Sequence, residues 1–125
     1  MFNTIVVGTD GSDTATQAVR EAVDMAKAVG ATLELVSASA AVSEELEASL
    51  ADAAEIARAA GVGVNTHARE GDPADAILAV AEERGADVVI VGNKGMTGAK
   101  RFLLGSVPDK ISHHAPCSVM IVRTT

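Results

Sequence analysis

The chain has 125 residues, of which 48% are hydrophobic, and it carries a formal net charge of −7. A chain of this length has the size of one ordinary domain and buries enough surface to stabilise a core without disulfides, so we expect a single domain over residues 1–125. The acidic balance and the lack of tyrosine and tryptophan argue against nucleic acid and anionic membrane surfaces as partners.

Other features of the sequence indicate a cytoplasmic protein. No apolar run approaches the roughly 20 residues that a membrane-spanning helix needs. The N-terminus has neither the positive leader nor the cleavage site of a secretory signal. Cys117 is the only cysteine, which agrees with a reducing compartment.

The first third of the chain predicts a strand, a helix and a second strand. Residues 4–8 form a β-branched run typical of a strand buried on both faces, and residues 33–36 are the second strand. Between them, apolar residues recur at helical spacing over residues 15–29, and Gly30 ends this helix. Thr14 and Gln17 have the spacing of a capping box at its start.

The middle of the chain repeats this alternation. Ser43 is the expected cap of a helix that stops at Gly61, and residues 62–67 are a weaker strand, expected toward an edge of the sheet. Asp72 precedes a proline, so it is the expected N-cap of a further helix, which runs to Gly85.

The last third predicts two more strands, residues 87–91 and 118–122, with a helix between them. This helix starts near Ser106, has Asp109 as a capping partner and is ended by Pro116. The histidines of its last turn complement the helix dipole and have no expected catalytic role. Five strands alternating with four helices predict an α/β fold, a doubly wound, Rossmann-like parallel sheet with helices on both faces.

Ligands of such sheets bind beyond the carboxyl ends of the strands, where the winding reverses, and two loops there are unusual. Asp10 follows the first strand, which brings a carboxylate within reach of a ribose hydroxyl. The loop after the fourth strand is rich in glycine and leads into Gly105, Ser106 and Val107 at a helix N-terminus, a plausible phosphate cradle. The patterns of P-loop and dinucleotide-binding proteins are absent from both loops.

Second interpretations of these residues stay open. Asp10 also has the position of a cap for the turn before the first helix, and the glycines also suit a flexible loop, but ligand contact is the favoured interpretation of both. Lys100 and Arg101 are either a solvated pair or phosphate contacts. Cys117 reads as a small hydrophobic residue rather than a redox group. His67, Arg69 and Glu70 end the third strand but have no metal-ligand or triad spacing.

The spacing Gly92-x2-Gly95-x9-Gly105-Ser106 resembles the ATP-binding pattern of the universal stress protein family. The resemblance extends from residues 5–12 to residues 114–117 and implies the sheet order 3-2-1-4-5. It also implies ATP as the ligand, with Mg²⁺ or Mn²⁺ carried on the phosphates. The site residues that it implies are Thr9, Asp10, Ala38, Gly92, Lys94, Gly95, Gly105, Ser106 and Val107.

Within that set, the resemblance assigns Thr9 and Asp10 to the adenosine and the backbone of Ala38, just past the second strand, to the adenine edge. Gly92 flanks the ribose, the later residues hold the phosphates, and Lys94 is an added phosphate contact. The sequence departs from the family pattern at Ser118, at Pro108 and in the short connection over residues 39–42.

Three functions follow as hypotheses. The first is a nucleotide-dependent binding module that acts on an unidentified protein partner, to which the family resemblance adds a role in stress response and homodimerisation. Its dimer edge is the fifth strand, with Val119, Met120, Ile121 and Val122. Because no general base is evident, we expect ATP hydrolysis to be slow or absent. The alternatives are a slow ATPase on the same site and an interaction scaffold that has lost the nucleotide.

Overall fold

The computed structural model describes residues 2–93 and 106–124. The described strands are β1 (Thr4–Gly8), β2 (Thr32–Ser39), β3 (Val64–Glu70), β4 (Val88–Gly92) and β5 (Ser118–Val122). The described helices are α1 (Asp13–Val29), α2 (Glu44–Ala59), α3 (Pro73–Arg84) and α4 (Ser106–His114). This alternation is the one that the sequence predicts.

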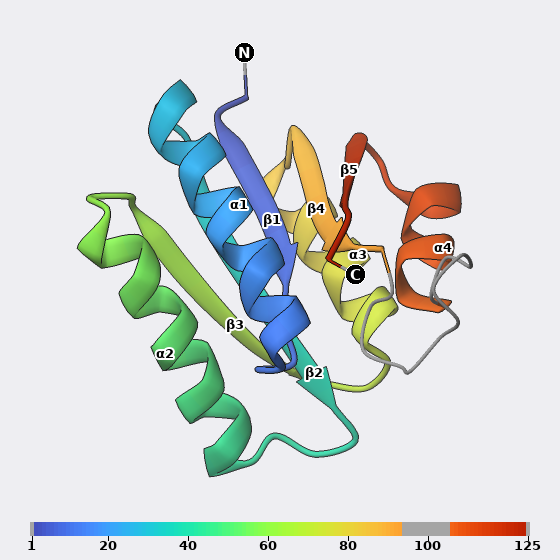
Figure 1. Cartoon of the computed structure of the whole chain (residues 1–125). Helices are drawn as coiled ribbons and strands as arrows, with labels where there is room; N and C mark the ends of the chain where they lie inside the picture. Colours follow the sequence, from blue (N-terminus) through green and yellow to red (C-terminus); the bar gives the residue numbers. More distant parts are fainter. Residues whose placement is uncertain (1, 94–105, 125) are drawn as a thin grey trace.

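The strands form one parallel sheet in the order β3-β2-β1-β4-β5, which confirms the expected doubly wound α/β fold. Helices α1 and α2 pack on one face of the sheet, and α3 and α4 pack on the other (Figure 1). The chain winds from β1 outward to β3 and then crosses back to β4. The winding therefore reverses between β1 and β4.

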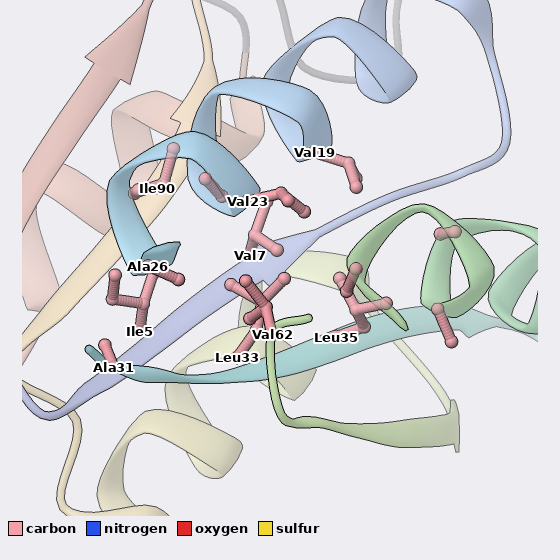
Figure 2. Packing of buried hydrophobic residues seen from close by; sticks show 14 of the residues in the cluster. Ile5, Val7, Val19, Val23, Ala26, Ala31, Leu33, Leu35, Val62 and Ile90 are labelled. Carbon is pink, nitrogen blue, oxygen red and sulfur yellow. The ribbon is translucent and has the colours of Figure 1, made fainter. Parts of the chain in front are cut away.

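Successive residues of β1 supply both halves of the core, because side chains alternate between the faces of a strand. Ile5 and Val7 pack toward α1 and α2, and Figure 2 shows Val7 beside Val23 and Ile5 beside Ala26 of α1. Val6 points the other way and packs with Ile77 of α3. The central strand is thus buried on both faces, as its β-branched sequence predicts.

The ends of three helices follow the sequence signals. Gly30 and Gly85 adopt the left-handed conformation, with φ of 73° and 60°, and end α1 and α3. Ser43 Oγ accepts the Leu46 N–H at 3.1 Å at the start of α2. Asp72 caps α3 in the same way.

The capping box predicted for α1 is wrong. Ser12 is the N-cap, and its Oγ accepts the Ala15 N–H at 3.2 Å. The reason lies in the backbone, because Ser12 is extended whereas Thr14 already lies inside the helix. At α4, the Asp109 carboxylate lies 3.7 Å from His113 Nδ1, one turn further on.

The boundaries of β2 and β3 also differ from the predicted ones. The third strand starts at Val64 because Val62 still belongs to the end of α2: its N–H donates to the Ala57 carbonyl at 2.9 Å and its side chain lies in the core (Figure 2). Strand β3 then pairs with β2 as far as Ser39 and Glu70, which lengthens both strands. Ala38, expected just past the second strand, therefore lies inside it.

Asp87, expected within the fourth strand, precedes it. Its carboxylate accepts the N–H groups of Asn3 and Thr4 at 2.7 and 2.9 Å, and these backbone bonds hold the pKa of Asp87 below its usual range. The residue thereby ties the amino ends of β1 and β4 together. None of the described helices is long and apolar enough to cross a membrane.

Candidate functional site

The carboxyl ends of β1 and β4 lie side by side at the point where the winding reverses. The two strands pair directly, with Val7 beside Ile90. The loops that follow them consequently leave the sheet at the same edge, which is where open α/β sheets bind their ligands. The structure thus brings together the strand ends from which the two singled-out loops start, whereas residues 94–105 of the second loop lie outside the described residues.

The turn after β1 is held by its own side chains. Thr9 is 1% exposed, donates its N–H to the Val36 carbonyl at 2.9 Å and accepts the Gly11 N–H on its Oγ1 at 3.1 Å. Asp10 is exposed, and its Oδ1 accepts the Ser12 N–H at 2.9 Å. Asp10 therefore does cap the turn, as the second interpretation has it, while its exposed carboxylate faces a pocket described below.

Gly11 closes this turn in a conformation that favours glycine, with φ of 82°. A Cβ at this position would meet the Ser49 side chain of α2. The start of α2 therefore packs closely against the turn that carries Asp10. This contact between α2 and Gly11 helps to hold the turn with Asp10 at the ends of the strands.

A first hollow lies between the ends of β1 and β4. It is shallow, because a water molecule can enter only about 20 Å³ of it, and it is mostly apolar. Gly8 and Gly92 form its floor, Val107 of α4 forms one wall, and Thr124 forms another. A Cβ at Gly8 would meet Ile77, so glycine is the residue that leaves β1 room to pass under α3.

A second hollow lies beside the end of β2. It holds about 660 Å³ with its mouth included. Six of its eight lining residues carry a hydroxyl or carboxylate group; the eight are Asp10, Ser37, Ala38, Ser39, Ser43, Glu45, Leu46 and Ser49. Asp10 follows β1 and Ala38 lies in β2, and both residues line this one pocket. A flat, hydrogen-bonding group such as a nucleobase has the chemistry that this lining suits.

Helix α4 brings its N-terminus to the first hollow. Ser106 is its first residue and is exposed, and Val107 is 9% exposed. The free N–H groups and the dipole of a helix start favour negative charge. Phosphate oxygens in this hollow would therefore meet a favourable field.

Ion pairs fix α4 against α3. Lys110 Nζ lies 2.7 Å from Asp75 and 3.6 Å from Asp72, and the bond to Asp75 chiefly raises the pKa of Lys110. Both carboxylates lie at the start of α3. These half-exposed contacts orient α4, although exposed pairs contribute little to stability.

The described residues include six of the nine predicted ligand contacts. Thr9, Asp10, Ala38 and Gly92 lie on the strand ends, and Ser106 and Val107 lie on α4. The other three, Lys94, Gly95 and Gly105, lie outside the described residues, as do Lys100 and Arg101.

Sequence reasoning missed most of the residues that line the two hollows, among them three with hydroxyl groups, and the asparagine that holds one of these. Ser37 and Ser49 line the second hollow, Thr124 lines the first, and Asn93 holds Thr124. No motif marks them. The register of β4 and β5, which sets Gly92 beside Val122, is the signal that would have placed Thr124 near the glycine.

The edge strand β5 leaves apolar side chains accessible. Its four predicted dimer residues are half-buried or exposed, and Ile121 is 41% exposed. Strand β4 pairs with one side of β5, and no described strand pairs with the other. Cys117, just before it, is half-buried, and burial raises the pKa of its thiol, which fits a small hydrophobic residue.

A buried polar cluster lies beneath β2 and β3, away from the two hollows. Glu34 is 3% exposed; its carboxylate lies 2.8 Å from His67 Nε2 and accepts the Asn65 amide at 2.8 Å. Arg84 Nε approaches it to 3.5 Å. Every carboxylate oxygen thus has a partner, and the described residues contain no group of three or more acidic, histidine or cysteine side chains that could hold a metal ion.

Comparison with known proteins gives concordant similarities. The profile of the Universal stress protein family matches residues 1–52 and 37–123. A universal stress protein of Mycobacterium tuberculosis is 36% identical over 146 residues, covering 99% of this chain and 98% of the relative.

Solved structures agree with these sequence similarities. A universal stress protein crystallised in complex with cAMP superimposes with a TM-score of 0.85 at 37% identity, covering 99% of this chain and 98% of the other. The universal stress protein of Archaeoglobus fulgidus in complex with dAMP has a TM-score of 0.80 at 25% identity, covering 97% of this chain and 98% of its own. Two similar proteins thus carry an adenine nucleotide.

Proposed function

Because the chain belongs to the universal stress protein family, we propose that it binds an adenine nucleotide, ATP in the first place, across the two hollows at the carboxyl ends of β1 and β4. The observation that carries the proposal is the juxtaposition of the Asp10 turn with the N-terminus of α4 across Gly8 and Gly92. The cAMP and dAMP complexes of similar proteins support the choice of adenine.

In this proposal the base occupies the second hollow, and the phosphates lie over the shallow first one, beside the N-terminus of α4. The backbone of Ala38 meets the adenine edge and Asp10 meets the adenosine, both from the lining of the second hollow. Gly92, in the lining of the first hollow, flanks the ribose. Thr9 is 1% exposed and lines neither hollow, so its contact with the adenosine rests on the sequence pattern alone. Ser106 and Val107 offer the helix N-terminus to the phosphates. The residues Lys94, Gly95 and Gly105 complete the phosphate contacts on the strength of the sequence pattern alone.

The donor set fits a metal carried by the nucleotide. The described residues offer no carboxylate and histidine cage, so Mg²⁺ or Mn²⁺ would be held on the phosphate oxygens. No carboxylate is placed to activate water over the first hollow, whose described lining is apolar apart from two threonines. We therefore expect ATP hydrolysis to be slow at most and the protein to act by binding.

The proposed role is a nucleotide-dependent binding module that works as a homodimer through β5 and presents its surface to a protein partner in stress response. Nucleotide binding acts by shifting the population of the state that the partner recognises. The scaffold alternative keeps the dimer without the nucleotide. It is favoured if the purified protein neither carries nor binds an adenine nucleotide.

The test is a calorimetric titration with ATP and Mg²⁺, preceded by mass spectrometry of the protein as purified. We expect Asp10→Ala to weaken ATP binding at least about tenfold, because a hydrogen bond between a charged group and a ribose hydroxyl is lost. Asp13→Ala is the matched control, since it removes an exposed carboxylate three residues away on α1. Equal affinities of the two variants would contradict the proposed ribose contact.

A further inference from the structure

The residue that follows β5 by two positions covers part of the candidate site. Thr124 lines the first hollow together with Gly8, Gly92 and Val107. Its Cγ2 and Oγ1 both lie 3.5 Å from the point where a Cβ of Gly92 would be. The threonine therefore fills the space above that glycine, so that the chain after the edge strand forms a wall of the hollow.

Asn93 fastens this wall. Its Oδ1 accepts the Thr124 N–H at 2.8 Å and the Thr124 hydroxyl at 3.2 Å, and its own N–H donates to the Val122 carbonyl at 2.8 Å. Asn93 is 9% exposed. We call these three hydrogen bonds the Asn93–Thr124 clasp.

The clasp joins two parts of the molecule that the proposed function uses separately. Asn93 follows β4 directly, where the glycine-rich segment begins, and Thr124 follows the edge strand β5. A carboxamide oxygen that accepts two bonds from one residue fixes that residue more tightly than packing alone. Loss of the clasp would remove both hydrogen bonds between Thr124 and the Asn93 side chain.

We propose that Asn93 and Thr124 are positioning residues of the nucleotide site, because the clasp holds the end of β5 as a wall of the hollow in which the nucleotide binds. The proposal rests on the proposed function. It implies that formation of the clasp and nucleotide binding are linked: if the clasp strengthens nucleotide binding, the bound nucleotide must stabilise the clasp to the same extent. The position of the edge strand thereby regulates nucleotide affinity.

Substitutions at Thr124 separate the hydroxyl from the shape of the side chain. Thr124→Val keeps the branched shape and removes the hydroxyl, and Thr124→Ser keeps the hydroxyl. We expect Thr124→Val to bind ATP with Mg²⁺ several-fold more weakly than wild type, and Asn93→Ala about tenfold more weakly, because it loses both side-chain bonds. Thr124→Ser should bind within about twofold of wild type.

A matched control tests the same chemistry elsewhere. Thr32→Val changes an exposed threonine at the amino end of β2 and should leave the affinity unchanged. Circular dichroism melts report whether each variant folds. If Asn93→Ala does not fold, the two Thr124 variants decide the question, because both keep the backbone bond to Asn93.

Amide hydrogen exchange measured by NMR gives a readout that a merely structural role would not move. The Thr124 N–H donates to the Asn93 side chain, so saturating ATP with Mg²⁺ should slow its exchange in wild type. In Thr124→Val the slowing should be smaller. In Thr32→Val it should equal that of wild type.

The outcomes separate this inference from the function on which it rests. If wild type binds ATP while every variant binds equally well and exchange at Thr124 is unchanged, the positioning role is wrong and the proposed function stands. If Thr124→Ser is as weak as Thr124→Val, the hydrogen-bonded clasp is wrong. If wild type binds no adenine nucleotide, both the inference and the proposed function fall.

Discussion

At the scale of single residues, the buried pair of Glu34 and His67 is the feature that most constrains β2 and β3. Strand β3 pairs with β2 so that Glu34 lies beside Asn65, which brings His67 within reach of the same carboxylate. Removing one member of a buried, hydrogen-bonded pair leaves the other desolvated without compensation. The cluster is therefore a point at which a single change is costly.

We expect Glu34→Ala to lower the free energy of unfolding by about 2–3 kcal/mol, because His67 and Asn65 lose their shared partner. Urea unfolding at neutral pH measures this loss. Glu83→Ala is the matched control: it removes the exposed partner of Arg69 and should change stability far less. Equal losses in the two variants would show that the cluster contributes no more than a surface pair.

This cluster also shows where sequence reasoning stops. Glu34 and His67 are 33 residues apart, and no spacing rule connects them. They meet because β3 pairs with β2 in a register that sets Asn65 beside Glu34, and His67, two residues further on, lies on the same face of the sheet as Asn65. A glutamate in an apolar strand was the available signal, since buried carboxylates need partners.

At the scale of the elements, local signals predicted helix ends well and strand ends poorly. The helix caps at Asp72, Ser43 and the two left-handed glycines depend on hydrogen bonds that span at most four residues. Such caps can therefore be predicted from the local sequence. Strand limits depend on how far the neighbouring strand continues, as β2 and β3 do to Ser39 and Glu70. The same dependence hid Thr124, whose place is set by the register of β5 against β4.

The N-cap of α3 gives a prediction at this scale. Asp72→Ala should lower the free energy of unfolding by about 1 kcal/mol, because the Asp75 N–H loses its acceptor. Asp72→Asn keeps the cap and removes the charge near Lys110, so it should lie close to wild type. Thermal or urea unfolding of the three proteins distinguishes the cap from the ion pair. A loss that is the same for both variants would assign the effect to Lys110 instead.

At the scale of the whole molecule, the sheet has two open edges of different character. Strand β3 offers Asn65, Thr66 and Glu70 as exposed side chains, and a polar edge of this kind discourages pairing. Strand β5 offers Val119, Met120 and Ile121, all apolar. The expected homodimer would therefore form at β5, where pairing also covers apolar surface.

The ladder identifies which backbone groups of β5 remain for a second copy. The Asn93 N–H donates to the Val122 carbonyl, so the backbone groups of Val122 face β4. Because successive residues of a strand direct their backbone N–H and C=O groups to opposite sides, those of Met120 also face β4, and those of Ile121 and Val119 face the open edge. Proline at Met120 would break the sheet itself. Proline at Ile121 removes a donor that only a partner copy would use.

We therefore expect wild type to have twice the mass of one chain by light scattering and Ile121→Pro to have the mass of one chain. Thr66→Pro is the matched control on the other edge strand. The Gly71 N–H donates to the Ser39 carbonyl of β2, so by the same alternation the backbone N–H of Thr66 points away from β2, toward the open edge. This substitution should leave the dimer intact, because β3 is not the pairing edge. If Ile121→Pro stays folded and dimeric, the two copies associate through another surface than the edge of β5.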